Sequence, residues 1–153
     1  MDTLVAAERG SAEVLGWGVR ESLLTYLTAV GGEIALSDGA EQRSHGFCFP
    51  ITSAGATRIE TRGAVRLSAH GGLFLLELRD LILDSSDGET RLLTHDEGAG
   101  RTLILGTAAL VDSSDLRSAP LRLHAEAAPL FGGSYGIGTE LAPVEFFATG
   151  ISI

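Results

Sequence analysis

Cysteine is nearly absent from this sequence. The 153 residues contain one cysteine, one tryptophan and two tyrosines. A single thiol excludes an internal disulfide and any zinc or iron–sulfur site built from several cysteines. Because Cys48 lies between Phe47 and Phe49, we expect a buried thiol with a structural role.

Basic side chains are also scarce. The chain has 11 Lys and Arg against 20 Asp and Glu, which gives a formal net charge of −9. Duplex DNA and anionic membrane surfaces require a basic patch, so we do not expect either as a partner. A small ligand in an apolar pocket remains compatible with this charge.

Long apolar runs are missing as well. The longest candidate, residues 103–111, contains Gly106 and Thr107 and has the length of a strand. A membrane-spanning helix needs about 20 apolar residues, so we expect no membrane span. Residues 1–10 carry acids where a signal peptide carries bases, which predicts a cytoplasmic protein. If the chain is a fragment of a longer protein, an exported or cell-surface location is the alternative.

One amphipathic helix is predicted over Trp17–Val30. At about 100° per residue, one apolar arc of roughly 100° contains five residues. They are Val19, Leu23, Tyr26, Leu27 and Val30. Tyr26 would lie in the middle of this buried stripe, where an unpaired hydroxyl is costly, so its phenol requires a partner. Gly31 and Gly32 predict the end of the helix.

The remainder of the chain is typical of short strands separated by turns. One principal helix and roughly ten strand candidates predict a mainly β (α+β) fold, an antiparallel β-sandwich or barrel-like structure. Pro50 favours an edge position or a strand end. We expect residues 1–14 to be an N-terminal arm and residues 15–153 to form a single domain.

The clearest local prediction is a β-hairpin around Gly71-Gly72. Its expected cross-strand pairs are Ala69 with Phe74, Leu67 with Leu76, Val65 with Leu78, and Arg66 with Glu77. One face of the hairpin is then wholly apolar, which specifies the register. His70 falls at the tip on the mixed face, beside Leu73, and the leucines there suggest that something covers this face.

Motifs that would indicate catalysis or cofactor binding are incomplete or missing in this sequence. The glycine-rich loop 132–138 opens onto a strand and follows no βαβ unit, so a dinucleotide fingerprint is not supported. No G-x-S-x-G elbow is present for a nucleophilic serine. The histidines are scattered, and none of their spacings predicts a zinc site. These histidines are His45, His70, His95 and His124.

Three ordered motifs resemble one known family. They are Trp17–Ser22 leading to Tyr26, the hairpin tip Ala69–Leu73, and Phe131–Tyr135 followed by Gly138–Val144. Together with Gly46-Phe47 and Phe49-Pro50, they are similar to the HtaA domain of actinobacterial haem-uptake proteins. The resemblance runs from about Leu15 to Ile151.

The resemblance implies a haem-binding protein whose helix forms one wall of a haem pocket. It makes Tyr26 the axial ligand of ferric iron, His70 its hydrogen-bond partner, and Tyr135 and Phe131 further pocket residues. The implied cofactor is ferric haem b, bound non-covalently. The implied function is haem binding, transfer or storage. The implied partners are haem and another haem-carrying protein, and a homodimer is left open. Arg20, Arg58 and Arg66 are the candidates for meeting the haem propionates.

Two alternatives to a non-enzymatic haem binder stay open at this point. Tyrosine ligation also occurs in catalase, so a haem-dependent enzyme of peroxidase or catalase type is one of them. The sequence identifies no acid or base for such chemistry. A β-sandwich interaction module that keeps the fold without the cofactor is the other. A haemin titration distinguishes a haem-binding protein from an interaction module without the cofactor.

Overall fold

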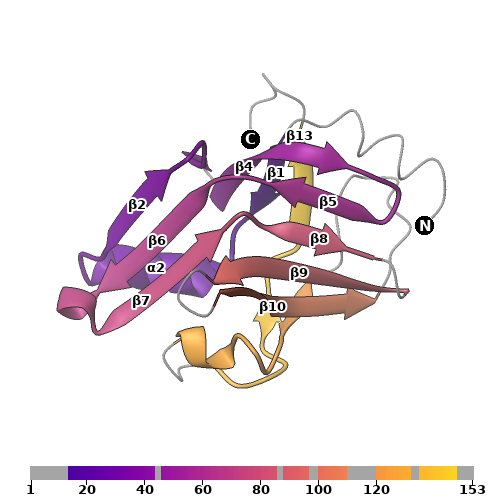
Figure 1. The fold of residues 1–153 in the computed structure, drawn as a ribbon. Helices are drawn as coiled ribbons and strands as arrows, with labels where there is room; N and C mark the ends of the chain where they lie inside the picture. Colours follow the sequence, from indigo (N-terminus) through magenta and orange to yellow (C-terminus); the bar gives the residue numbers. More distant parts are fainter. Residues whose placement is uncertain are drawn as a thin grey trace.

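The fold is mainly β with one principal helix, as predicted (Figure 1). The computed structural model describes residues 14–43, 46–85, 88–96, 100–109, 120–131 and 135–147. In these ranges the chain forms one α-helix, two 3₁₀ turns and thirteen strands. Every strand pairing is antiparallel. None of the described helices is long and apolar enough to span a membrane.

A ten-stranded, curled antiparallel sheet of half-barrel form makes up most of the molecule. Its order is β12-β11-β10-β9-β8-β5-β4-β1-β13, and β3 pairs with β4 beside this path. A bulge between Ile104 and Gly106 interrupts the register of β10 with β9. The strands are β1 (Val14–Trp17), β3 (Glu41–Arg43), β4 (Gly46–Ala54), β5 (Arg58–Thr61), β8 (Ile82–Asp84), β9 (Glu89–Asp96), β10 (Arg101–Ala109), β11 (Leu121–Leu123), β12 (Glu140–Leu141) and β13 (Val144–Phe147).

A second, three-stranded sheet contains the predicted hairpin. Its order is β2 (Glu33–Ser37), β6 (Ala64–Ala69) and β7 (Phe74–Arg79). The predicted register is confirmed at every pair, from Val65 with Leu78 to Ala69 with Phe74. Arg66 and Glu77 form the expected ion pair across the polar face, with 3.5 Å between Nε and Oε2. The apolar face packs into the core, since Leu67 and Leu76 are fully buried.

The helix α2 (Glu21–Ala29) begins later than predicted. Trp17 belongs to β1, where it pairs with Phe47 and Val144. Val19 adopts φ +58°, a left-handed conformation that is rare for a β-branched residue and interrupts the chain before the helix. Ala142 holds this turn, because its N–H donates to Val19 O (2.8 Å) and its O accepts from Trp17 Nε1 (2.7 Å).

The helix ends at its glycines, as predicted. Gly31 has φ +69°. Its N–H donates to Thr28 O (3.3 Å), and the Gly32 N–H donates to Leu27 O (2.8 Å). This pair of bonds is a Schellman motif, which satisfies carbonyls left free at a helix end. The chain then enters β2 directly.

Only a narrow face of α2 is buried. Leu23 and Leu27 join the core that also contains Leu67 and Leu76. Tyr26 is 45% exposed and Val30 is 39% exposed, so the prediction that Tyr26 lies in the middle of a buried stripe is wrong. The physical reason is that the helix is short and packs on the sheet through two leucines, which leaves its flank open.

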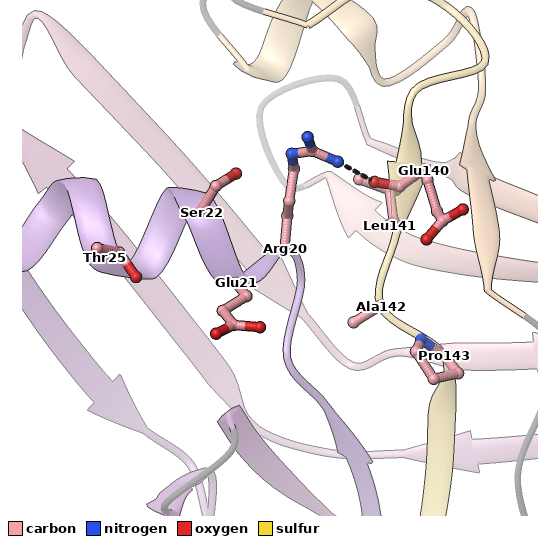
Figure 2. A pocket seen from close by; sticks show the side chains of 8 residues that line it. All are labelled: Arg20, Glu21, Ser22, Thr25, Glu140, Leu141, Ala142 and Pro143. Atoms are coloured by element: carbon pink, nitrogen blue, oxygen red, sulfur yellow. Dashed lines mark hydrogen bonds between the residues drawn. The ribbon is translucent and has the colours of Figure 1, made fainter.

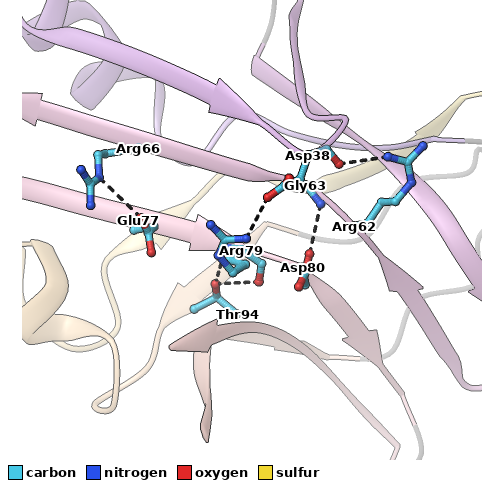
Figure 3. Close-up of polar contacts among 8 residues, drawn as sticks. All are labelled: Asp38, Arg62, Gly63, Arg66, Glu77, Arg79, Asp80 and Thr94. Atoms are coloured by element: carbon cyan, nitrogen blue, oxygen red, sulfur yellow. Dashed lines mark hydrogen bonds and ion pairs between the residues drawn. The ribbon is translucent and has the colours of Figure 1, made fainter. Parts of the chain in front are cut away.

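Polar contacts fix the base of the β6–β7 hairpin (Figure 3). Arg79 Nη1 lies 3.0 Å from Asp38 Oδ2 in the β2–β3 turn. The buried Thr94 hydroxyl of β9 accepts from Arg79 N (2.8 Å) and donates to Arg79 O (3.2 Å). Asp80 Oδ1 accepts from Gly63 N (3.1 Å). These contacts therefore tie the hairpin to the β2–β3 turn and to β9.

Strand β4 confirms one prediction about its residues and corrects another. Cys48 is buried, and burial raises the pKa of its thiol, as expected for a structural cysteine. Pro50 lies inside β4 and not at an edge or an end; it is at the point where the pairing of β4 passes from β3 to β5. His45 lies outside the described residues.

Candidate functional site

The structure brings Tyr26 and His70 together, although 44 residues separate them. Tyr26 Oη lies 2.5 Å from His70 Nε2, a short hydrogen-bond distance. The two ring centroids are 6.0 Å apart, with the planes tilted by 55°. Which atom donates depends on the tautomer of the imidazole and on the protonation of the phenol.

The hairpin tip directs His70 toward the helix. The β6–β7 ladder ends at Ala69 and Phe74, and the next residues form the 3₁₀ turn η1 (His70–Gly72). His70 has φ +56°, and Gly71 and Gly72 also have positive φ. Strand alternation therefore no longer applies at His70. The prediction that it belongs to the mixed face is wrong, because the left-handed turn carries its ring to the side of α2.

A cavity of about 430 Å³ surrounds this pair. All four predicted pocket residues line it, together with three that were not predicted for this role. The lining residues are Leu23, Tyr26, His70, Leu73, Phe74, Phe131 and Tyr135. Leu73 is 91% exposed at the rim, so the cavity reaches the molecular surface. Its size falls within the range of about 300–1,000 Å³ that is usual for small-molecule sites.

Leu23 and Phe74 were missed as lining residues because both lie on faces that the sequence assigns to the core. Phe74 is the last paired residue of the hairpin, and Leu23 lies one turn before Leu27 on the helix. A residue at the margin of a core can also line a cavity. Periodicity does not separate these two environments.

Tyr135 is fixed from two sides. Its ring makes an edge contact with Phe131, with centroids 5.9 Å apart and planes at 72°. Phe131 ends the 3₁₀ turn η2 (Ala128–Phe131) and is fully buried. On another side, Arg20 Cζ lies over the Tyr135 ring at 5.2 Å from the centroid, within cation–π range.

Arg20 also borders a second, more polar cleft of about 630 Å³. Figure 2 shows its guanidinium reaching from the start of α2 toward β12. Nη1 donates to Glu140 O at 2.5 Å. The cleft is lined by Arg20, Glu21, Ser22, Thr25, Glu140, Leu141, Ala142 and Pro143.

The other two candidate arginines have ion-pair partners elsewhere. Arg58 pairs with Glu60 (2.8 Å) and Asp84 (3.1 Å), and Arg66 pairs with Glu77 on the polar face of the hairpin. Of the three, Arg20 is the one that contacts a residue lining the cavity. Within the described ranges, no group of three His, Cys, Asp or Glu residues is placed to hold a metal ion. The described lining residues with an oxygen or nitrogen donor in the side chain are Tyr26, His70 and Tyr135.

Comparison with known proteins identifies the family and supports the fold. The family model for HtaA (Htaa) matches residues 12–147. The C-terminal domain of HtaA from Corynebacterium glutamicum superposes with a TM-score of 0.72 at 20% identity, covering 89% of this chain and 94% of that one. The N-terminal domain of the same protein gives 0.67 at 22%, covering 92% and 98%. The heme-binding protein HtaB from that organism gives 0.66 at 18%, covering 88% and 91%.

A search of curated proteins found no match. The structural likenesses establish the fold, and the family match covers most of the sequence. The chain belongs to the HtaA family.

Proposed function

We propose that this protein binds ferric haem b non-covalently in the 430 Å³ cavity, with Tyr26 as the axial ligand of the iron. The observation that supports this most is the contact between Tyr26 Oη and His70 Nε2 at 2.5 Å, on the wall of an otherwise apolar cavity. The family match and the likeness to the heme-binding protein HtaB support haem as the ligand.

The donor set fits ferric haem. When bound, ferric haem supplies a Lewis-acidic iron that favours the anionic form of a phenol. Tyr26 is 45% exposed and faces the cavity, so its oxygen is accessible to a ligand. A phenolate is a hard, anionic donor and prefers ferric to ferrous iron. Such a site suits capture and release of oxidised haem better than oxygen carriage.

His70 supports the ligand and does not replace it. With the phenol deprotonated, His70 Nε2–H donates to Tyr26 Oη, which stabilises the negative charge and fixes the direction of the oxygen. The backbone of the tip is held in left-handed conformations from His70 to Gly72, so the imidazole is already oriented before a ligand arrives.

The walls of the cavity suit a flat, apolar macrocycle. Leu23 of α2, Phe74 of the hairpin and the fully buried Phe131 line it. In this proposal α2 is one wall of the haem pocket. These side chains exclude water from the bound face and offer dispersion contacts to the ring.

The lining favours binding over catalysis. Among the described lining residues, those that titrate are Tyr26, His70 and Tyr135, and the first two are engaged with one another. Peroxide chemistry most often uses a His, Asp or Glu as acid or base on the open face of the haem, and the one such residue in the described lining is His70, which is engaged with Tyr26. We therefore propose haem binding, transfer or storage, with another haem-carrying protein as donor or acceptor.

A haemin titration followed by absorption spectroscopy tests this function. The wild-type protein should take up one haemin per chain and develop the spectrum of tyrosine-ligated ferric haem. Tyr26→Phe should lose that spectrum and bind more than about tenfold more weakly. Tyr135→Phe is the matched control, since it removes the other tyrosine hydroxyl of the chain and should keep the spectrum. Unchanged ligation in Tyr26→Phe would refute the assignment.

A further inference from the structure

We infer that Arg20 is a positioning residue that holds the Tyr135 ring against the cavity, and that this contact slows the loss of bound haem. The part of the inference that concerns haem rests on the proposed function. The contact between the two side chains stands on the geometry alone.

The guanidinium of Arg20 is held at two points. Nη1 donates to Glu140 O at 2.5 Å, which ties the side chain to β12. Cζ lies 5.2 Å from the centroid of the Tyr135 ring. Nε is buried and has no hydrogen-bond partner among the described residues. The aromatic face of Tyr135 supplies a favourable electrostatic contact to this cation.

The start of the helix leaves Arg20 little freedom to move. Arg20 immediately follows the left-handed Val19, whose O accepts from Ala142 N. Its own backbone O accepts from Leu23 N (3.0 Å) and Leu24 N (3.2 Å) and so begins α2. The side chain thus projects from a point that is anchored both to the helix and to the residues after β12.

Tyr135 and Arg20 line two different hollows formed by the described residues. Tyr135 lines the 430 Å³ cavity, Arg20 lines the 630 Å³ cleft, and the two side chains contact one another. Without Arg20, the remaining described ring contact of Tyr135 is the edge of Phe131. A wall that moves more freely should release a bound macrocycle faster.

A different role for Arg20 would be direct pairing with a haem propionate. The two roles predict different results with haemin dimethyl ester, in which both carboxylates are blocked. If Arg20 acts through Tyr135, Arg20→Gln speeds loss of the diester by the same factor as loss of haemin. If the effect disappears with the diester, Arg20 pairs with a carboxylate and the inference is wrong.

The rate of haem loss to an excess of apomyoglobin measures the effect. Arg20→Gln should lose haemin about three- to tenfold faster than wild type while keeping the tyrosine-ligated spectrum. Arg20→Lys keeps the cation and should give an intermediate rate. Arg66→Gln is the matched control on the opposite face of the hairpin, where it should change the rate by less than about twofold.

A double-mutant cycle tests whether Arg20 acts through the ring. In a Tyr135→Leu background, Arg20→Gln should change the rate of haem loss by less than about twofold. In a Tyr135→Phe background the full effect should return, because the aromatic face is kept. A full effect in the Tyr135→Leu background would overturn the inference.

The ligand-free protein provides a readout independent of haem. In urea denaturation, the double variant Arg20→Gln/Tyr135→Leu should be destabilised by less than the sum of the two single variants. Strict additivity would contradict the contact. If the wild type takes up no haemin, the proposed function fails, yet this cycle still tests whether Arg20 holds Tyr135.

Discussion

At the scale of single residues, the proposed site depends on how one phenol and one imidazole are oriented. Tyr26 lies on the open flank of a short helix, so its hydroxyl can meet both a ligand and a side chain. His70 reaches it from a left-handed turn at the tip of a hairpin. Because the two residues belong to separate elements, either side chain can be substituted without changing the other.

His70→Ala should weaken haemin binding less than Tyr26→Ala. The first change removes a supporting hydrogen bond, for which about a tenfold loss is typical, whereas the second removes the iron ligand. Haemin affinity measured by titration of both variants decides the order. His124→Ala is a suitable control, since His124 lies on the turn after β11 and does not line the cavity. An equal or greater loss in His70→Ala would mean that the ligand is misidentified.

Cys48 gives a prediction about pH. Burial raises the pKa of its thiol, so the folded protein holds this proton at pH values where the unfolded chain loses it. The free energy of unfolding should therefore fall as pH rises above the ordinary thiol range of about 8.5, and Cys48→Ala should lack this component. In addition, iodoacetamide should alkylate the native protein at pH 8.5 far more slowly than the urea-unfolded chain. Equal rates would contradict a buried thiol.

At the scale of elements, the hairpin was predictable and the start of the helix was not. The β6–β7 register follows from alternation over six residues and a glycine pair, which are local signals. The helical pattern of Trp17 and Val19 is misleading, because Trp17 is paired in β1 and Val19 is left-handed. Both features depend on pairing with strands that are distant in the sequence. The local periodicity of the sequence carries no information about this pairing.

Thr94→Val tests the anchor at the base of the hairpin. The buried Thr94 hydroxyl accepts from Arg79 N, and a methyl group of similar size cannot. Losing both hydrogen bonds of this hydroxyl, with Arg79 N and Arg79 O, should lower the free energy of unfolding by about 1–3 kcal/mol in urea denaturation. Thr102→Val at an exposed position of β10 should change it by less than about 0.5 kcal/mol. Equal effects would show that the hydroxyl does not anchor the hairpin.

At the scale of the whole molecule, the site forms where distant segments meet. Strand β1 pairs with both β4 and β13, so the helix that follows β1 lies beside the residues that precede β13. The hydrogen bond from Ala142 N to Val19 O is part of this junction. Tyr135 and the hairpin tip line the same cavity as residues of α2.

The four predicted pocket residues follow from a family resemblance and not from local chemistry. Tyr26, His70, Phe131 and Tyr135 carry no spacing that would bring them together, and their proximity depends on the sheet order. The role of Arg20 was not predictable for the same reason. In the sequence it was one of three arginines considered for the haem propionates, and its contact with Tyr135 exists because β12 approaches the start of the helix.

Resonance Raman spectroscopy of the haemin-loaded protein tests the central claim most directly. The chain has two tyrosines, so vibrations of an iron-bound phenolate can be assigned by ring-deuterated tyrosine and two single variants. We predict isotope-sensitive phenolate bands in the wild type and in Tyr135→Phe, and their loss in Tyr26→Phe. Phenolate bands that persist in Tyr26→Phe, or that are absent from the wild type, would contradict Tyr26 as the ligand of ferric haem.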